Sequence, residues 1–248
     1  MGISVIIITY NEQNNIKKCL ESVKWADEII IVDSGSKDKT LDIVKKYTDK
    51  IYIHKWRGYS KDKNFGISKA KNEWILSIDS DEIVSDKLKR EIIRVIKNTK
   101  FDGFFISRKV YFLNKWIKHC GWYPDYQLRL FKRSKGRFDE NKLVHEHVKL
   151  NGRIGYLKSN LLHFPYKDLN QYFQRFNKYT TLSANEMYKE DKKGCFINLM
   201  LNPFFTFFKM YFLKLGFLDG FSGFVVCFLS SFYNFVKYSK LWELTRKK

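Results

Sequence analysis

The chain has 248 residues, and its 46 Lys and Arg against 26 Asp and Glu give a formal net charge of +20. With 44% hydrophobic and 29% charged residues, the composition excludes a disordered chain and indicates a globular protein. The charge favours an anionic partner such as nucleic acid, acidic lipid or phosphorylated glycolipid, although a well-solvated Lys-rich surface gives the same balance. The four cysteines, at 19, 120, 195 and 227, are too far apart for a disulfide framework or a zinc ribbon, which favours a reducing compartment.

Taken in chain order, the first 80 residues alternate between a strand pattern and a helix pattern. The strand stretches are apolar and rich in β-branched residues, and the helical stretches repeat apolar residues every three or four positions. The strand pattern occurs at 3–8, 29–32, 51–54 and 74–78, and the helical pattern at 16–23, 41–47 and 61–70. This alternation predicts an α/β fold with a mostly parallel central sheet and right-handed crossovers.

The second half of the chain is less regular. A helical pattern at 88–96 is followed by a section, 104–158, that predicts mixed strands and loops. From residue 196 aromatic and aliphatic residues dominate, but the most apolar run, 221–236, is shorter than the roughly 20 residues of a membrane-spanning helix. We therefore expect C-terminal amphipathic helices that lie in the membrane interface, with a buried helical hairpin as the alternative.

Polar side chains follow three of the predicted strands. They lie in the segments 9–12, 33–36 and 79–81. Because ligands of open parallel sheets bind outside the carboxyl ends of the strands, we expect the three segments to converge on one crevice. There Asp79 and Asp81 could hold a divalent cation through carboxylate oxygens, and such a cation would neutralise the charge of a nucleotide diphosphate.

The other polar residues suit the nucleoside part of such a ligand. Asp33 could accept a hydrogen bond from a base or a ribose, and Thr9 and Tyr10 would form walls around the base. The predicted crevice is therefore a site for a nucleotide diphosphate.

The runs VIIITYNE, VDSGSKDKT, KNFG and LSIDSDE, within residues 3–82, together resemble the nucleotide-binding half of family 2 glycosyltransferases. The resemblance implies the GT-A fold, a Rossmann-like nucleotide-diphospho-sugar transferase fold, with a UDP-sugar as donor and Mg²⁺ or Mn²⁺ as cofactor. It implies that Asp33 contacts uracil and that Asp79 and Asp81 are the metal and ribose carboxylates of a DxD motif. The implied nucleotide-binding residues are Thr9, Tyr10, Glu12, Asp33, Asn64 and Asp79, and the implied metal ligands are Asp79, Asp81 and His163. A buried structural role is the alternative for His163.

The second half of the chain narrows the resemblance. The runs YPDYQLRLFKR, LVHEHV, LLHFPYKDLNQYFQRFNKYT and LGFLDGFSG are similar to lipopolysaccharide core glucosyltransferases of the WaaE or KdtX type. This implies transfer of a sugar, glucose in the narrower expectation, to a lipid-anchored oligosaccharide such as the lipopolysaccharide inner core. The alternative within the class is transfer of another UDP-hexose for capsule or other glycolipid synthesis. The alternative from another class is a noncatalytic basic module that binds nucleic acid or membrane, which leaves the acidic strand ends unexplained.

Inversion at the anomeric carbon needs one carboxylate to take the proton of the attacking hydroxyl. The family commonly supplies it from a Glu-Asp pair, and here the corresponding stretch is Val144 to His147, where that pair is absent. Glu146 is our candidate for the catalytic base, and Asp125 is the alternative.

The sequence also favours a place at the cytoplasmic face of the inner membrane, with peripheral contact to anionic lipid. The N-terminal stretch lacks the basic region and the cleavage site of a signal peptide. A basic stretch, Arg129, Lys132, Arg133, Lys135 and Arg137, could meet phosphate groups of an acceptor or of lipid, or could simply be solvated. By role, we expect a nucleotide-sugar-binding half at 1–100, an acceptor-binding and catalytic half at 101–195, and a membrane-associating segment at 196–248.

Overall fold

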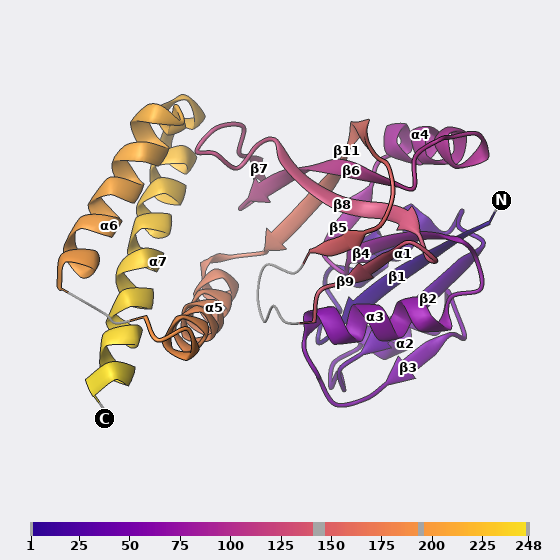
Figure 1. Cartoon of the computed structure of the whole chain (residues 1–248), viewed down its shortest axis with the longest axis horizontal. Coiled ribbons are helices and arrows are strands. Elements are labelled where there is room, and N and C mark those ends of the chain that lie inside the picture. The colour runs from indigo at the N-terminus through magenta and orange to yellow at the C-terminus, as the bar shows by residue number, and fades with distance from the viewer. Residues whose placement is uncertain (1, 141–146, 193–195, 247–248) are drawn as a thin grey trace. The chain divides into compact units, whose positions relative to one another are not determined.

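The computed structural model describes residues 2–140, 147–192 and 196–246 (Figure 1). The chain forms two compact units. The first contains the residues up to 108 together with 125–163, and the second contains 109–124 and the residues from 164 onwards. The three regions expected from the sequence are divisions by role, and they stay a prediction.

The central sheet is mixed, with a parallel half formed by the N-terminal strands. Its strands lie in the order β3-β2-β1-β4-β8-β6-β11-β5, with β7 paired to β6. Strands β1 to β4 pair in parallel, whereas β8 is antiparallel to both β4 and β6, and β5 is antiparallel to β11. The bounds are β1 Ile3–Thr9, β2 Glu28–Asp33, β3 Ile51–Ile53, β4 Trp74–Asp79, β5 Glu82–Val84, β6 Gly103–Phe112, β7 Lys115–Trp116, β8 Asp125–Lys132 and β11 Ile154–Tyr166. The predicted parallel β/α alternation is confirmed.

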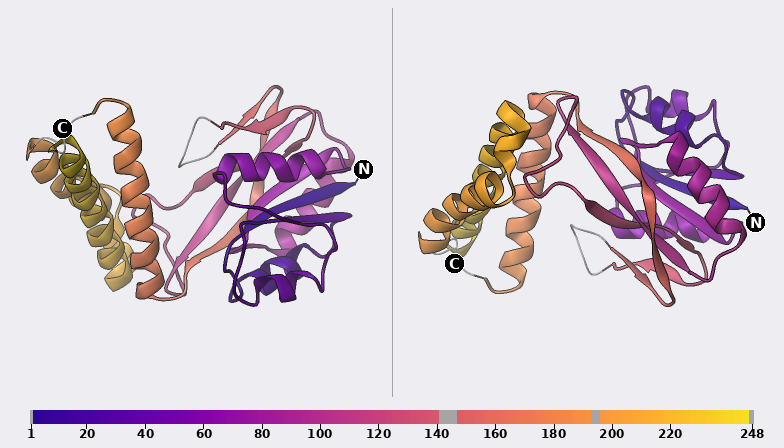
Figure 2. Two further views of the ribbon diagram at one scale, coloured as in Figure 1. Left: turned by 90° about the horizontal axis from the view of Figure 1, so that it is seen from below. Right: turned by 90° about the horizontal axis from the view of Figure 1, so that it is seen from above.

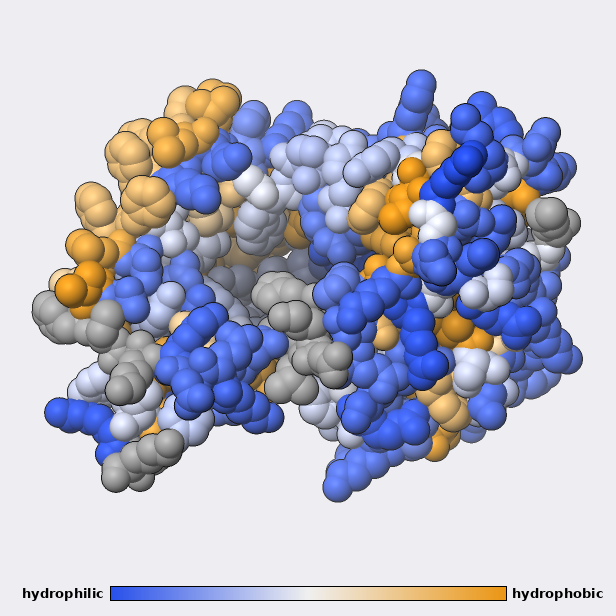
Figure 3. Space-filling model, in the orientation of Figure 1, coloured by the Kyte–Doolittle hydropathy of each residue, from blue (hydrophilic) through white to orange (hydrophobic). Residues whose placement is uncertain are grey.

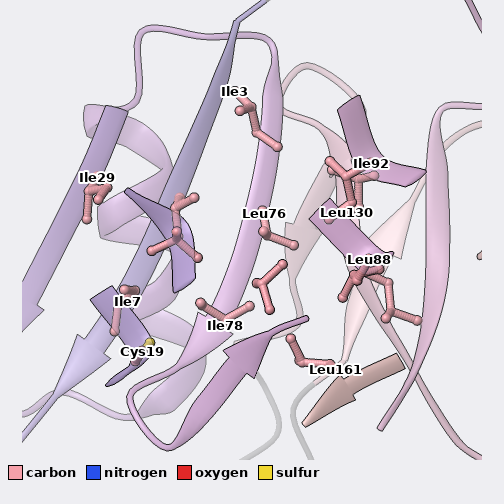
Figure 4. Packing of buried hydrophobic residues seen from close by; sticks show 14 of the residues in the cluster. Ile3, Ile7, Cys19, Ile29, Leu76, Ile78, Leu88, Ile92, Leu130 and Leu161 are labelled. Atoms are coloured by element: carbon pink, nitrogen blue, oxygen red, sulfur yellow. The ribbon is translucent and has the colours of Figure 1, made fainter. Parts of the chain in front are cut away.

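Successive residues of β1 point to opposite faces of the sheet, and each face is covered by helices. Ile3 and Ile7 belong to a buried cluster with side chains of α1 and α4 (Figure 4), whereas Ile6 packs with α3. Each buried aliphatic side chain of this kind contributes about 1.5–3 kcal/mol. The helices of this unit are α1 Ile16–Val23, α2 Thr40–Val44, α3 Tyr59–Lys69 and α4 Asp86–Lys97.

Gly66 explains how closely α3 lies against the sheet. A Cβ atom at this position would be 2.5 Å from a methyl carbon of Ile6 and 3.2 Å from one of Val32. Any larger residue would therefore push α3 away from β1 and β2. Since Lys63 and Asn64 lie on the same helix, the glycine of the KNFG run fixes where their side chains reach.

The second unit is largely helical. It contains α5 (Leu169–Lys189), α6 (Phe196–Phe208), the short helical turns η1 (Lys209–Leu213) and η2 (Gly216–Asp219), and α7 (Gly220–Arg246). The three long helices lie together in Figure 2, and they share a buried cluster that includes Tyr172, Phe176 and Val226. The expected C-terminal helices are thus present.

Asp219 joins the start of α7 to the segment after β7. Its carboxylate, 4% exposed, accepts hydrogen bonds from the backbone N–H groups of Lys118 and His119, the shorter at 2.7 Å. Lys115 Nζ donates to the carbonyl oxygen of Asp219 at 2.7 Å. A buried carboxylate needs such donors, so the aspartate of the LGFLDGFSG run has a structural role.

The helical stretch that contains the apolar C-terminal run 221–236 extends beyond that run at both ends. One continuous helical stretch, 216–246, is long and apolar enough to cross a membrane by length and composition, and 33% of its most apolar window is buried within the chain. The core helix of a soluble protein passes the same test. Length therefore does not separate the spanning, interfacial and buried alternatives.

Candidate active site

The three predicted polar clusters do meet at one edge of the parallel sheet. Thr9 lies opposite Asp33 in the β1–β2 pairing, and Ile8 lies opposite Asp79 in the β1–β4 pairing. The ends of three adjacent strands therefore present Thr9, Asp33 and Asp79 side by side. This is the edge of the sheet, at the carboxyl ends of the strands, where the ligand crevice is expected.

Asp33 is fully buried and shapes the loop that follows β2. Its Oδ1 accepts the backbone N–H groups of Gly35 and Ser36 at 2.9 and 2.7 Å, and its Oδ2 accepts the Ser36 hydroxyl at 2.6 Å. Gly35 has a φ of +88°, which a residue with a side chain rarely adopts. Asp33 thus holds a turn at the rim of the crevice, and its contact with a base stays a prediction.

The residues after β1 differ in how open they are. Thr9 is buried, and its hydroxyl has no hydrogen-bond partner among the described residues. Tyr10 is 53% exposed. Glu12 is tied into the loop, because its backbone N–H donates to Thr40 Oγ1 and its carboxylate accepts Asn15 Nδ2, both at 2.8 Å. The expected roles of Thr9, Tyr10 and Glu12 towards a nucleotide are compatible with these positions and remain untested.

Asp79 is held between two cations. Its Oδ1 lies 2.8 Å from Lys63 Nζ, and its Oδ2 lies 2.6 Å from Arg129 Nη2. Burial alone would raise the pKa of Asp79, but Arg129 and Lys63 outweigh it and hold that pKa well below its usual range. The carboxylate is therefore ionised at neutral pH, with both oxygens already in contact with positive charge.

A buried ion-pair network extends from Asp79 through Glu82, which is fully buried at the start of β5. Glu82 accepts the backbone N–H of Asp79 at 2.9 Å and pairs with Arg129 at 2.9 Å and Arg108 at 3.1 Å. Arg108 in turn pairs with Asp125 at 2.6 Å. Each buried charge has an opposite charge beside it, as low-dielectric surroundings require.

This network adds four side chains to the site residues expected from the sequence: Lys63, Glu82, Arg108 and Arg129. A signal was present for two of them, because Lys63 belongs to the KNFG run and Glu82 ends LSIDSDE. Arg129 appeared only as part of a basic surface stretch. In the structure it is 5% exposed and faces the crevice carboxylates.

Asp81 and His163 form a second pair of possible ligands. Asp81 is 6% exposed, and its Oδ1 lies 3.4 Å from His163 Nε2. The β5–β11 register, which sets His163 opposite Glu82, brings them together. The other ring nitrogen, Nδ1, is buried with no hydrogen-bond partner among the described residues.

No group of three or more His, Cys, Asp or Glu side chains in the described part of the chain is arranged to hold a metal ion. A carboxylate oxygen is nevertheless a ligand that suits Mg²⁺ and Mn²⁺, whereas an imidazole nitrogen suits softer metals better. Mg²⁺ commonly binds one or two protein ligands and takes the rest from substrate phosphates and water. Asp81 and His163 therefore fit a cation that arrives with a diphosphate, whereas Asp79 is occupied by its two cations.

Asn64 links α3 to the small sheet formed by β9 (Gly136–Phe138) and β10 (Val148–Leu150). Its side chain bonds the backbone N–H and C=O of Phe138 at 2.9 and 3.0 Å, and donates to Glu140 at 2.8 Å. The side chain thus has a structural task, and its predicted contact with the nucleotide stays a prediction.

Glu146, the predicted base, lies outside the described residues, as does His145. The residues on either side of the stretch 141–146 are anchored: Glu140 is bonded to Asn64, and the backbone N–H of Asp139 donates to the carbonyl of His147 at 3.0 Å. Asp125 begins β8, where Gln127 Nε2 donates to its Oδ1 at 2.7 Å.

The mixed sheet, with its parallel N-terminal half, defines a transferase fold of the GT-A class. Residues 4–156 match the sequence pattern of Glycosyl transferase family 2, and the chain belongs to this family. The lipopolysaccharide core biosynthesis glycosyltransferase LpsC of Rhizobium meliloti is 31% identical over 98% of this chain and 93% of its own. An uncharacterized glycosyltransferase of Rickettsia bellii is also 31% identical, over 98% of this chain and 87% of its own.

Solved structures support the fold. S. aureus TarS 1-349 in complex with UDP-GlcNAc matches with a TM-score of 0.51, covering 100% of this chain and 92% of that one. At 17% sequence identity this likeness concerns the fold alone. The expected GT-A fold and membership of family 2 are confirmed.

Proposed function

We propose that this glycosyltransferase moves glucose, with inversion and with the help of a divalent cation, from UDP-glucose to a lipid-anchored oligosaccharide such as the lipopolysaccharide inner core. The observation that carries the donor site is the alignment of Thr9, Asp33 and Asp79 across three adjacent strand ends. The acceptor class is supported by the full-length likeness to LpsC, which is named for lipopolysaccharide core biosynthesis. The donor class is supported by TarS, which was solved with UDP-GlcNAc.

In this proposal Asp33 and the walls formed by Thr9 and Tyr10 receive the uridine. Asp81 and His163 would hold Mg²⁺ or Mn²⁺, and the cation would neutralise charge on the departing diphosphate. Lys63 and Arg129 keep Asp79 ionised and fixed in place. Asp79 would meet a ribose hydroxyl, one of the two partners predicted for the DxD pair, and the cation is left to Asp81 and His163.

Glu146 is the proposed catalytic base. Support comes from the residues that flank its stretch: Glu140 is bonded to Asn64, the chain neighbour of Lys63, and Lys63 contacts Asp79. Glu140, the last described residue before this stretch, therefore lies beside the helix whose Lys63 contacts Asp79. A carboxylate there would take the proton of the acceptor hydroxyl as the hydroxyl attacks the anomeric carbon.

The test is thermal unfolding of the purified protein with UDP, with and without Mn²⁺. A ligand at 100 times its dissociation constant stabilises the folded state by about 2.7 kcal/mol. We expect a rise in melting temperature that needs both components, followed by sugar transfer from UDP-glucose to extracted core glycolipid. No shift with UDP under either condition would refute the proposed donor site. A shift in melting temperature without sugar transfer from UDP-glucose would support the proposed donor site and would exclude glucose as the transferred sugar.

We further propose that the second unit docks on the cytoplasmic face of the membrane through α6, η1 and the start of α7. Hydrophobic side chains gather over α6 (Figure 3), and Phe204 and Phe221 are 74% and 81% exposed. Lys209 and Lys214 lie exposed among them. Exposed aromatics beside lysines suit an interface of acyl chains and anionic headgroups.

Exchange of both Phe204 and Phe221 for serine should weaken binding to vesicles of phosphatidylglycerol and phosphatidylcholine by roughly 100-fold or more. Burial of each phenylalanine side chain among the acyl chains contributes about 1.5–3 kcal/mol to the free energy of binding, and the exchange removes this contribution. Vesicle flotation measures the loss. Tyr156→Ser is the matched control, because this 63% exposed aromatic lies in the first unit. Equal binding by the double variant and the wild type would exclude this surface as the membrane contact.

A further inference from the structure

A groove of about 380 Å³ lies in the first unit, between α4 and β11. Its walls carry four basic side chains and one carboxylate: Lys87, Arg90 and Arg94 from α4, Lys158 from β11, and Glu91. Positions 87, 90 and 94 are three and four residues apart, so they share one face of the helix. None of these residues belongs to the crevice at the strand ends.

The groove is built firmly, because Glu91 bonds α4 to β11. Its two oxygens accept the backbone N–H groups of Lys158 and Ser159, at 3.0 and 2.8 Å. Burial raises the pKa of Glu91, but these hydrogen bonds outweigh it and keep that pKa low. A second tie is made by Ser85, whose hydroxyl donates to the carbonyl oxygen of Asn160 at 3.1 Å. The single carboxylate of the groove is thus engaged by the backbone of β11.

The four cations are less well compensated, although the charge of Arg94 helps to lower the pKa of Glu91. Among the residues that the structure describes, no ion pair joins Lys87, Arg90, Arg94 or Lys158 to a carboxylate. Like charges gathered on one concave surface repel each other until an anion neutralises them.

The basic stretch singled out in the sequence behaves differently. Arg129 pairs with Asp79, Lys132 pairs with Asp102 at 2.8 Å, and Arg137 pairs with Glu140 at 3.2 Å. Arg133 donates to the carbonyl of Ala70 at 2.7 Å. Most of its positive charge is therefore compensated within the protein. The basic side chains of the groove, by contrast, have no ion-pair partner among the described residues.

We propose that the groove between α4 and β11 binds a phosphate group, carried by a lipid headgroup or free in solution. Arginine presents a planar fork of donors that matches phosphate oxygens, and two arginines converge here. Residues 87 to 94 span only about 10 Å along the helix axis. That length suits one or two phosphates and is short for a nucleic-acid strand. The proposal concerns binding alone and does not depend on the proposed sugar transfer.

The decisive comparison uses two double variants that remove the same charge. Arg90→Gln with Arg94→Gln changes the groove, whereas Lys17→Gln with Lys18→Gln changes two exposed lysines of α1. Phosphorus NMR titration with inorganic phosphate gives the affinity of the full chain. The arginine variant should bind about tenfold more weakly or worse, since each charge-assisted hydrogen bond is worth about a factor of ten. The lysine variant should change by less than about twofold, because screened surface charges act weakly.

Vesicles of phosphatidylglycerol, with phosphatidylcholine alone as the neutral reference, identify the source of the phosphate. A parallel loss of vesicle binding in the arginine variant assigns the groove to lipid headgroups, and unchanged vesicle binding assigns it to free phosphate. Equal losses in both double variants would mean only diffuse attraction and would overturn the proposal. So would unchanged phosphate affinity combined with weaker binding of a single-stranded oligonucleotide. If the arginine variant unfolds, Lys158→Gln repeats the test from β11.

Discussion

Replacing Asp81 with alanine should abolish sugar transfer and the Mn²⁺-dependent binding of UDP together. Asp81 is nearly buried, and its carboxylate lies 3.4 Å from His163 Nε2. These are the two groups that we propose hold the cation. A bound cation supplies several kcal/mol of charge stabilisation in the transition state, so turnover should fall about 10³-fold or more. Steady-state kinetics and thermal unfolding with UDP and Mn²⁺ measure the two losses.

Asp42→Ala is the control, because Asp42 is an exposed carboxylate on α2. It removes the same charge without touching the crevice, and its turnover should match the wild type. If Asp81→Ala kept both turnover and the Mn²⁺-dependent shift, Asp81 would not belong to the site. A variant that kept UDP binding without any need for Mn²⁺ would instead count against the proposed cation.

The parallel half of the sheet could be predicted because its physics is local. A strand buried on both faces needs a nearly continuous apolar run, and residues 3–8 and 74–78 supply one that only Ser4 and Ser77 interrupt. Once the strands are parallel, their carboxyl ends share one edge. The meeting of Thr9, Asp33 and Asp79 then follows from topology without any knowledge of side-chain contacts.

The partners of Asp79 could not be predicted in the same way. Arg129 and Arg108 come from strands 50 and 29 residues further along the chain, and their pairing with Asp79 and Glu82 depends on how β8 and β6 add to the sheet. In the sequence Arg129 looks like one of several basic surface residues. Only the antiparallel pairing of β8 with β4 places it against the crevice, because antiparallel partners are set by long-range register.

The full extent of α7 could not be predicted from its apolar run either. The most apolar run, 221–236, is shorter than the roughly 20 residues of a membrane-spanning helix, and it includes Ser230, Ser231 and Asn234. In the folded chain Ser231 donates to the carbonyl of Pro203 at 2.7 Å, and Asn234 donates to Thr206 at 2.9 Å. Ser231 and Asn234 therefore face α6 and satisfy a backbone and a hydroxyl group there. These polar residues therefore break the apolar run in the sequence, but the helix continues through them.

Glu146→Gln should lower kcat by about 10² or more while UDP binding stays as in the wild type, the result expected when only a general base is lost. Both oxygens of the alternative base, Asp125, already accept hydrogen bonds. Its Oδ2 lies 2.7 Å from Arg108 Nε, and its Oδ1 accepts Gln127 Nε2 at 2.7 Å. To receive the acceptor's proton, Asp125 would have to release one of these donors.

Asp125→Asn separates the two assignments. If Asp125 only positions Arg108, the variant should lose stability in thermal unfolding, since an ion pair at a partly buried site is broken, and kcat should fall less than in Glu146→Gln. The pH profile of kcat/KM provides the second readout. Its acidic limb reports the ionisation of the base and should disappear in Glu146→Gln alone. A normal rate in Glu146→Gln, with a loss of about 10² and a missing acidic limb in Asp125→Asn, would transfer the role of base to Asp125.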